Sequence, residues 1–305
     1  MTEQNRNTGI LVLDKESGPT SHDVVAQVRR IVNERRVGHC GTLDPLATGV
    51  LVVCTGRFTR VNEWLSAGEK DYLVRLELGA VSDTFDAQGV LTPIKKAGTP
   101  SLTDIEQGLR HFQGRIMQRP PAYSAIKVAG KRSYELARQN RAVPLAARPV
   151  TIRVLAVDRY EFPRLELQIS CSRGTYVRTL ANDLGELLGC GAYVSTLRRT
   201  RVGSMTLGMA LSLAELEQAA LKGELESCYV PPHKALSDLE QVELSDVQLD
   251  SFTHGKAISH PLPTNAANVC AVFNDHRDLF GIGEWHTEQE LLKPLRVFRE
   301  LAHAN

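Results

Sequence analysis

The feature that most constrains the fold of this chain is a pair of long runs in which apolar and polar residues alternate. The runs cover Thr151 to Tyr160 and Leu165 to Cys171, and a short segment that contains Pro163 separates them. A period of two is typical of strands with one buried face, and a break of this length predicts an antiparallel hairpin. The two runs therefore indicate an antiparallel sheet.

Other predicted elements precede and follow this hairpin. Apolar runs predict buried strands over residues 9–14 and 50–54, and alternation predicts a strand over 72–78. Valines at helical spacing, after a capping Thr20 or Ser21, predict a helix that continues to Asn33. Because the strands and helices follow no regular βαβ period, we expect an α+β domain with a mixed, largely antiparallel central sheet flanked by helices.

The length and composition suit a large domain and a small one. The chain has 305 residues, of which 42% are hydrophobic and 23% charged, and these ordinary values exclude disorder, collagen and coiled coil. We expect a large domain over residues 1–247 and a small β module over 248–305, where short apolar runs are separated by turns. A module of this size is expected to dock on its neighbour, because it buries little core alone.

Targeting and metal signals are weak in this sequence. No apolar run approaches the ~18 residues that a membrane-spanning helix needs, and the first residues lack the regions of a signal peptide. We therefore expect a cytoplasmic protein that does not enter a membrane. The 6 cysteines are scattered without a C-x-x-C pair, so we expect reduced thiols and no metal site.

Charge is unevenly distributed along the chain, although the formal net charge is +1. Arginines and lysines dominate residues 110–153, where Glu135 is the one acid, and acids dominate residues 211–250. One surface can therefore attract phosphate groups while another repels them, although two solvated surfaces would give the same pattern.

An aperiodic loop over residues 35–49 is the first candidate for chemistry, because long aperiodic loops in compact domains usually carry function. It contains Asp44 before Pro45, with glycines on both sides that permit unusual backbone angles. A turn aspartate bonded to its own backbone explains this pattern equally well. His39 in the same loop fits a base, a ligand, a base-contacting side chain or a structural residue.

Residues 38–51, GHCGTLDPLATGVL, closely resemble the catalytic motif of the TruB-type tRNA pseudouridine synthases. Further segments resemble the family in the same order along the chain: 13–21, 70–72, 83–86, 120–127, 172–178 and 191–198. The resemblance covers residues 9–200. The C-terminal part resembles the PUA-type RNA-binding module of this family only in its length, its place and its β character.

This resemblance implies the pseudouridine synthase fold and an isomerase that converts the T-loop uridine of tRNA to pseudouridine. It implies a catalytic domain over 1–247, with a basic inserted loop at about 121–149, and a PUA-like module over 248–305. The reaction breaks the N1–C1′ bond, rotates the base and rejoins it through C5, so no cofactor and no metal are expected. The expected partner is the T-arm of tRNA, with no protein partner required and a monomeric enzyme.

The family's catalytic residues correspond to three positions here. Asp44 is expected to act either as a nucleophile at C1′ or as the base that removes a C2′ proton. Arg178 is expected to keep that carboxylate charged, because burial alone would raise its pKa. Tyr72 is expected to stack on the target base and to accept the C5 proton late in the reaction. From the sequence pattern alone, we would interpret Arg178 as a solvated helix residue and Tyr72 as a core residue.

The resemblance also implies contacts with RNA. His39 is expected to occupy the place that the flipped uridine leaves, and Tyr176 and Leu197 to sandwich the flipped nucleotide. On spacing alone, Leu197 is a core residue. The phosphate contacts are expected from the basic inserted loop, at Lys127, Lys131 and Arg132.

Two other functions remain open at this stage. A tRNA-binding or tRNA-folding protein without catalysis would keep the basic segment, and a chaperone role can coexist with isomerisation. A hydrolase that uses Asp44 as its nucleophile is the second alternative, but no water-activating His or second carboxylate is evident in the sequence. Asp44→Asn distinguishes the first alternative, and release of free uracil distinguishes the second.

Overall fold

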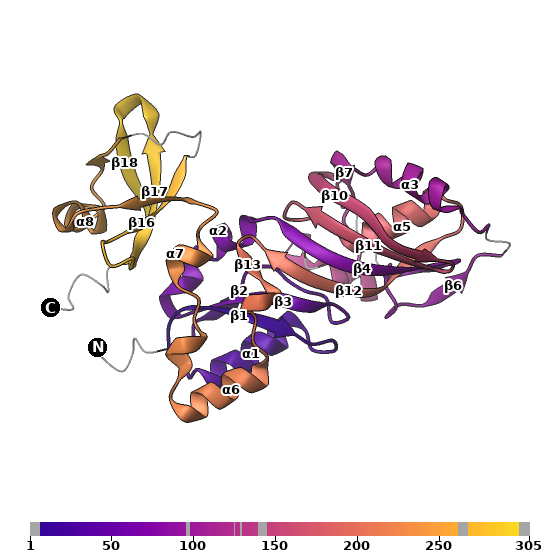
Figure 1. Ribbon diagram of the computed structural model, residues 1–305, viewed down its shortest axis with the longest axis horizontal. Helices are drawn as coiled ribbons and strands as arrows, with labels where there is room; N and C mark the ends of the chain where they lie inside the picture. The colour runs from indigo at the N-terminus through magenta and orange to yellow at the C-terminus, as the bar shows by residue number, and fades with distance from the viewer. Residues whose placement is uncertain are drawn as a thin grey trace.

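The structure is a computed structural model that describes residues 7–95, 98–124, 126–128, 130–139, 145–261 and 268–298. A long twisted sheet forms the body, and a small β module lies at one end of it (Figure 1). Within the described residues, the larger sheet has nine strands. The helices and 3₁₀ turns lie around this sheet and in the connection to the small module.

The main path of the large sheet runs in the order β1-β3-β12-β4-β11-β10-β7, with β2 beside β3 and β13 beside β12. Its strands are β1 (Ile10–Lys15), β2 (Val37–His39), β3 (Thr48–Thr55), β4 (Lys70–Leu78), β7 (Gly114–Gln118), β10 (Arg148–Glu161), β11 (Arg164–Cys171), β12 (Ala192–Val202) and β13 (Met205–Thr206). Every pairing is antiparallel except that of β3 with β12. The expected mixed, largely antiparallel sheet is confirmed, and β10 with β11 forms the predicted hairpin.

One expected loop contains a strand. The stretch 35–49 begins with β2, which adds to β3 with Val37 opposite Thr55 and His39 opposite Val53. Three residues are too few to produce a visible period in the sequence, so pairing with β3 decides their conformation.

The helices lie against the main core of the sheet, in the segment between β7 and β10, and in and before the small module. They are α1 (Ser21–Ile31), α2 (Asn62–Ala67), α3 (Leu102–Arg110), α4 (Ser133–Arg138), α5 (Val177–Leu187), α6 (Leu213–Lys222), α7 (Pro232–Ala235) and α8 (Asp246–Thr253), with 3₁₀ turns η2 (Gly56–Val61), η3 (Leu207–Met209), η4 (Leu225–Cys228) and η5 (Thr287–Gln289). α5 packs on β12 and α3 on β10, whereas α6 contacts α1 and β1 (Figure 1).

α1 begins where the sequence predicts. The Thr20 hydroxyl accepts a hydrogen bond from the N–H of Asp23 at 3.1 Å, and the Asp23 carboxylate accepts one from the N–H of Thr20 at 2.8 Å. These contacts satisfy donors that the first helical turn leaves free. The helix buries Val24, Val25 and Val28 in the main core, and this places its first residue, Ser21, against the loop that follows β2.

The small module is a five-stranded sheet with strand order β14-β16-β17-β18-β15. Its strands are β14 (Glu240–Glu243), β15 (Ile258–Ser259), β16 (Val269–Phe273), β17 (Leu279–His286) and β18 (Leu291–Val297). The expected boundary between residues 247 and 248 stays a prediction. β14, which precedes that boundary, pairs in parallel with β16 of the small sheet.

A second core joins the small module to the large sheet. Val50 and Val52 of β3 share one cluster of buried residues with Phe273, Ile282 and Phe298 of the module. The rings of Phe58, in η2, and Phe298 lie 6.0 Å apart between centroids. The expectation that the module docks on its neighbour is confirmed, because the module completes its core with residues of the larger domain.

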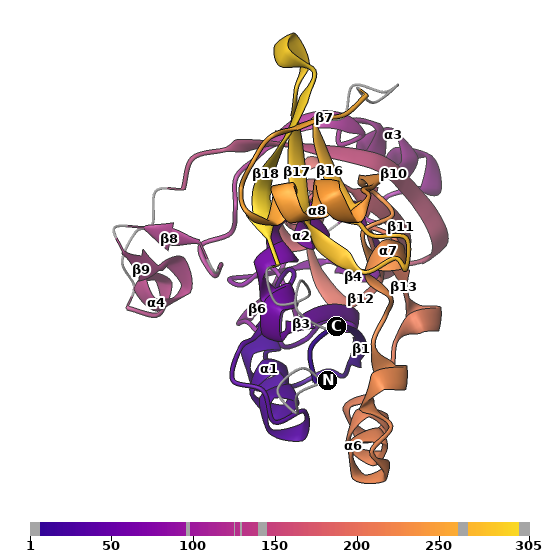
Figure 2. The same ribbon diagram turned by 90° about the vertical axis from the view of Figure 1, so that its left-hand side faces the viewer.

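Two short strands and a helix stand away from the body in Figure 2: β8 (Lys127–Val128), β9 (Lys131–Arg132) and α4. They lie in the basic segment that connects β7 to β10, and a further pair, β5 (Ala80–Ser82) and β6 (Leu91–Pro93), lies near β12. Among the described helices, none has the length and apolarity needed to cross a bilayer.

Candidate active site

Asp44 lies in the loop between β2 and β3, and buried polar contacts hold this loop in place. The Ser21 hydroxyl donates to the Leu43 carbonyl at 2.9 Å and accepts from the Leu43 N–H at 2.8 Å. Lys15, at the end of β1, is 2% exposed and donates to the Ala47 carbonyl at 2.7 Å. These contacts fix the backbone on both sides of Asp44.

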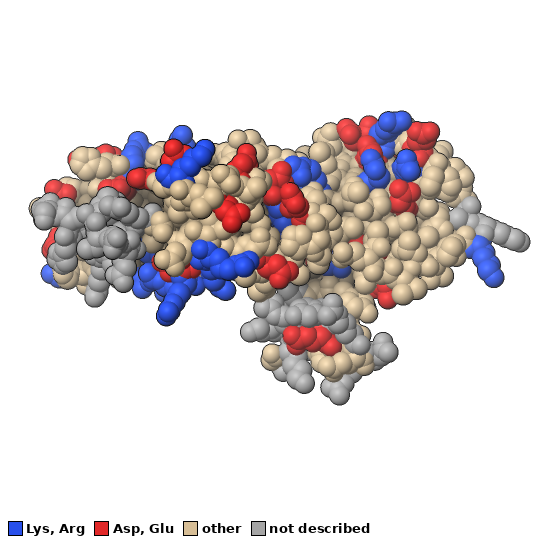
Figure 3. Space-filling view, turned by 90° about the horizontal axis from the view of Figure 1, so that it is seen from below, with Lys and Arg blue, Asp and Glu red and all other residues tan. Residues whose placement is uncertain are grey.

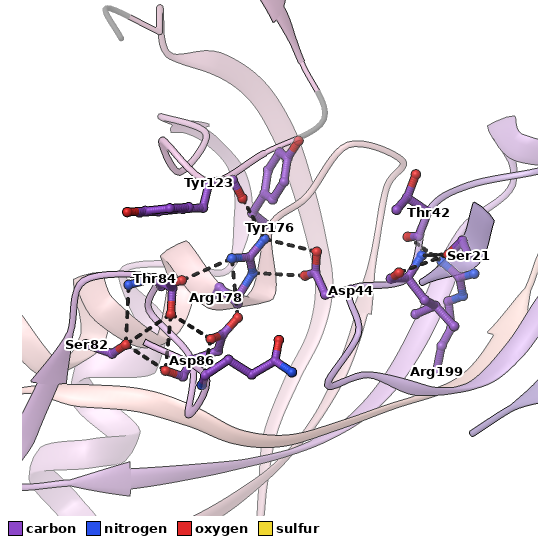
Figure 4. Close-up of polar contacts among 12 residues, drawn as sticks. Ser21, Thr42, Asp44, Ser82, Thr84, Asp86, Tyr123, Tyr176, Arg178 and Arg199 are labelled. Atoms are coloured by element: carbon purple, nitrogen blue, oxygen red, sulfur yellow. Dashed lines mark hydrogen bonds and ion pairs between the residues drawn. The ribbon is translucent and has the colours of Figure 1, made fainter. Parts of the chain in front are cut away.

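Arg178, near the start of α5, forms a two-pronged ion pair with Asp44 (Figure 4). Its Nε lies 2.9 Å from Oδ2, and a terminal nitrogen donates to Oδ1 at 3.1 Å. The Arg178 side chain is 6% exposed and that of Asp44 is 35% exposed, so the carboxylate faces open space while the cation lies behind it. Burial raises the pKa of Asp44, and the charge of Arg178 opposes that rise.

A second carboxylate, Asp86, lies on the other side of Arg178. Its Oδ2 is 3.4 Å from a terminal nitrogen of Arg178, and its side chain is 4% exposed. The Thr84 hydroxyl and the Gln88 N–H donate to Asp86 Oδ1 at 2.7 and 3.0 Å. Arg178 also donates to the carbonyl of Tyr123 at 3.0 Å. The guanidinium is therefore held in one orientation by groups that flank Asp44.

A cavity of about 610 Å³ opens beside Asp44. Tyr72 of β4 and Leu197 of β12 line it together with Tyr176, the residue before α5, and Arg178. The structure therefore brings together five of the residues that the sequence singles out, from four separate elements. Apolar and aromatic walls around one carboxylate suit a flat ring attached to a sugar.

Further cations line the same cavity. Arg148 lies over the ring of Tyr176, with its Cζ 5.3 Å from the ring centroid, and Arg173 and Lys70 are also in the lining. Lys70 is 7% exposed, and burial lowers its pKa to about 8. Positive groups around an open cavity suit an anionic ligand such as a nucleotide.

Tyr72 is 8% exposed and lies directly opposite Arg199 in the pairing of β4 with β12. Burial raises the pKa of the Tyr72 phenol, and the nearby guanidinium of Arg199 opposes this rise. The phenol therefore lies at the wall of the cavity with a buried cation beside it.

Family models match the chain over most of its length. The TruB family pseudouridylate synthase N-terminal domain matches residues 29–177, the tRNA pseudouridylate synthase B C-terminal domain matches 178–242, and a further TruB C-terminal model matches 241–298. A tRNA pseudouridine synthase B of Dehalococcoides mccartyi is 40% identical over 296 residues, which is 95% of this chain and 96% of that relative. The enzyme of that name from Pseudomonas putida is 40% identical over 96% of both chains.

The chain belongs to the TruB family. The family resemblance seen in the sequence is confirmed, and the protein is therefore a pseudouridylate synthase. Two solved structures are also similar to this TruB chain. An H/ACA ribonucleoprotein bound to a substrate RNA containing 2′-deoxyuridine has a TM-score of 0.75 at 25% identity, covering 98% of this chain and 87% of that chain. A Cbf5-Nop10-Gar1 complex has a TM-score of 0.74 at 27% identity, covering 97% and 85%.

Another predicted TruB site residue, His39, is not among the described residues that line the first cavity. His39 lies on β2, and its ring meets the ring of His22 edge to face at 5.4 Å between centroids. His22, unlike His39, lines a second cavity of about 760 Å³ that shares Asp44 and Arg178 with the first. The backbones of Lys127, Lys131 and Arg132 form β8 and β9, but their side chains lie outside the described part of the structure.

Sequence reasoning missed Asp86, Lys15 and Arg199 as parts of this TruB site. Asp86 and Lys15 lie in segments that resemble the family, and Arg199 directly follows another one. Their places in or beside these segments were the signal that could have identified them. Their contacts could not be predicted, because they join segments that are far apart in the sequence. Among the described residues, no group of three or more His, Cys, Asp or Glu side chains is arranged to hold a metal ion.

Proposed function

We propose that this TruB-family protein isomerises the T-loop uridine of tRNA to pseudouridine, with Asp44 as the catalytic carboxylate. The observation that carries the proposal is the two-pronged pair of Asp44 with the buried Arg178 at the wall of a cavity that Tyr72 and Leu197 also line. The relatives' name, tRNA pseudouridine synthase B, supports tRNA as the substrate.

Asp44 begins the reaction in either of two ways. In the first, its carboxylate attacks C1′ and the uracil leaves with the N1–C1′ bonding electrons. In the second, it removes the C2′ proton, and the electrons released there form a glycal as uracil leaves. Both routes need an ionised carboxylate beside the ribose. The role proposed for Arg178 is to keep Asp44 ionised despite burial, since an opposite charge at ion-pair distance lowers a carboxyl pKa.

The uracil then rotates, and its C5 forms the new bond to C1′. In the first route the Asp44 carboxylate leaves C1′ with the electrons of the ester bond, and in the second Asp44 returns the proton to C2′ of the glycal as C5 bonds to C1′. Tyr176 and Leu197 are proposed to hold the free ring between their surfaces while it turns. Tyr72 is proposed to accept the proton that C5 must lose, and N1 gains one from solvent, so the numbers of atoms and protons balance. No cofactor and no metal ion takes part in this proposal.

The target nucleotide must leave its stack, at a cost of a few kcal/mol. We propose that phosphate contacts from the basic segment, including Lys127, Lys131 and Arg132, offset this cost. His39 is proposed to stack in the vacated place. We assign residues 1–247 to catalysis and 248–305 to RNA binding, with the inserted loop at about 121–149 in the catalytic part.

A tRNA-folding role is a second candidate that can coexist with isomerisation. It is favoured by the position of β8, β9 and α4, which stand out from the body in Figures 2 and 3. RNA binding there does not require the carboxylate. We propose tRNA as the partner and a monomer that needs no protein partner, which light scattering of the purified protein with and without tRNA will check.

The test is tritium release from a tRNA transcript labelled at uridine C5. The wild type is expected to release tritium stoichiometrically with the T-loop uridine. Asp44→Asn, and a transcript with cytidine in place of that uridine, are expected to release none. Tight tRNA binding without release by the wild type would leave only the folding role, and free uracil among the products would indicate a hydrolase.

A further inference from the structure

Arg199 is a buried cation that the mechanism above does not use. It is 1% exposed, and its guanidinium donates to three backbone carbonyls. Nε donates to Val50 at 2.8 Å, one terminal nitrogen to Gly41 at 3.1 Å and the other to Thr42 at 3.4 Å. Gly41 and Thr42 precede Asp44 in its loop and Val50 follows it in β3, so one side chain joins both ends of the catalytic loop.

The charge of Arg199 has no anionic partner in the described part of the chain, where no carboxylate lies within 4.0 Å of it. Placing an unpaired charge in a protein interior is unfavourable, because the charge loses its hydration. Hydrogen bonds to carbonyls reduce this cost without neutralising the charge. Arg178 differs, because it faces the carboxylates of Asp44 and Asp86. Arg178 and Arg199 therefore differ in their pairing, and they lie on opposite sides of Asp44 in Figure 4.

Tyr72 lies beside Arg199 in the sheet. It is the direct partner of Arg199 in the antiparallel pairing of β4 with β12, and both residues line the cavity beside Asp44. Burial raises the pKa of the Tyr72 phenol, and the charge of Arg199 opposes this rise. A cation beside a phenol favours the phenolate, which is the form that can accept a proton.

We propose that Arg199 is a positioning residue with two roles: it holds the loop of Asp44 in place and keeps a positive charge against Tyr72 while Tyr72 accepts the C5 proton. The inference rests on the roles proposed above for Asp44 and Tyr72. In the step concerned, the Tyr72 oxygen bonds to the C5 proton, and the electrons of the C5–H bond restore the C5–C6 double bond of the base. The electrons of the C6–N1 double bond then move to N1, which takes a proton from solvent. The neutral phenol then returns its proton to solvent.

The matched variants are Arg199→Lys, Arg199→Met and Arg198→Lys. Lysine keeps the charge of Arg199 but loses the planar fork that reaches three carbonyls, and methionine loses both. Arg198 is the next residue in β12, and its side chain is 41% exposed and paired with Asp14 at 2.6 Å. Arg198→Lys is therefore a control for a change of arginine in this strand and should leave the rate unchanged.

The experiment measures single-turnover pseudouridine formation on tRNA transcripts that carry hydrogen or deuterium at uridine C5. We expect Arg199→Lys to lower the rate at least tenfold and Arg199→Met to lower it about 100-fold or more, since a proton-transfer group typically contributes ~10²–10⁴-fold. Both variants should bind tRNA with an affinity within about threefold of the wild type. The deuterium isotope effect should be larger in Arg199→Lys than in the wild type, because the C5 step then limits the rate.

A merely structural role would lower the rate without changing the isotope effect, and that result would overturn the proposal for Tyr72. A rate for Arg199→Lys within twofold of the wild type would overturn the whole inference. If Arg199→Met does not fold, the measurements on Arg199→Lys alone decide between these outcomes. Asp44→Asn is measured in parallel: pseudouridine formation by that variant would refute the proposed catalytic role of Asp44, whatever the Arg199 variants do.

Discussion

Arg178 is bound by two carboxylates of different exposure, and this difference separates their roles. The Asp44 carboxylate lines the cavity and is partly exposed. The Asp86 carboxylate is buried and accepts hydrogen bonds from Thr84 and Gln88. A buried arginine between two acids keeps a fixed orientation, because both ends of its fork are occupied. Asp86 thus orients the cation but also adds a negative charge that raises the pKa of Asp44.

Asp86→Asn is therefore expected to move the acid limb of the rate–pH profile to lower pH. Burial is the largest cause of the raised pKa of Asp44, and the negative charge of Asp86 raises it further. Asparagine removes that charge, so Asp44 stays ionised to a lower pH. Single-turnover rates across the acid range will check this shift. Asp83→Asn is the control, because Asp83 accepts a hydrogen bond from the Val90 N–H at 2.7 Å and is not among the charges that shift the pKa of Asp44. A limb that moves to higher pH would show that loss of Arg178 orientation outweighs the loss of charge.

At the scale of elements, the parallel pairing of β3 with β12 brings Arg199 to the catalytic loop. Gly49, opposite Arg199 in this pairing, has a φ of +97°, and a Cβ there would lie 2.1 Å from the Arg199 carbonyl oxygen. A positive φ costs a residue with a Cβ ~1–2 kcal/mol, and the backbone contact leaves no room for relaxation by a side chain. Gly49 is thus required by the close approach of two strands.

Gly49→Ala is expected to lower the free energy of unfolding by about 3 kcal/mol or more and to lower the isomerisation rate. The control is Gly223→Ala, where φ is +74° and a Cβ would meet nothing within 4 Å, so only the ~1–2 kcal/mol of backbone strain applies. Urea unfolding of both variants will check the difference. Equal losses for the two glycines would contradict the close approach of β12 to β3.

The inserted segment is expected to contribute electrostatic affinity for RNA. Replacing Lys127, Lys131 and Arg132 together by glutamine should weaken tRNA binding and reduce the slope of log K against log salt by about 2, at ~0.7–0.9 per lost phosphate contact. Arg159→Gln is the control, since Arg159 is 71% exposed and pairs with Glu161 elsewhere on β10. Affinity titrations at several salt concentrations will measure the slope. An unchanged slope would place the phosphate contacts elsewhere.

At the scale of the whole molecule, β3 is covered on both faces. Its Leu51 and Val53 lie in the main core, and Val50 and Val52 lie in the core shared with the small module. Apolar side chains that are buried between two units become exposed to water when either unit unfolds, so unfolding of one unit destabilises the other. The module therefore supports the strand that follows the loop of Asp44, and the two units should not unfold independently.

Phe298→Ala is expected to destabilise the entire chain by about 3–5 kcal/mol, because Phe298 is 2% exposed and packs against Phe58 of the larger domain. Calorimetry should show one cooperative transition that moves to lower temperature as a whole. Phe162→Ala, at a side chain that is 39% exposed, should change stability far less. Two separate transitions, of which Phe298→Ala moves one, would contradict the shared core.

Local features of the sequence determined several of the elements of this protein, although not β2. The cap at Thr20 and the valines that follow it predict α1, the alternating runs predict β10 and β11, and the setting of Asp44 before Pro45 predicts a shaped loop. Each signal is encoded within a few consecutive residues, since helix caps and side-chain periods are local properties. The family motifs also identified Asp44, Tyr72 and Arg178 as candidates, although no local pattern showed what they contact.

Only the tertiary structure decided which side chains meet. Arg178 lies 134 residues from Asp44 in sequence, and insertion of β12 between β3 and β4 brings Leu197 and Arg199 to the same cavity. The order of strands in a sheet depends on how all faces are buried together, which no short segment encodes. The roles of Asp86 and Arg199, and the shared core that holds the small module, arise from this arrangement.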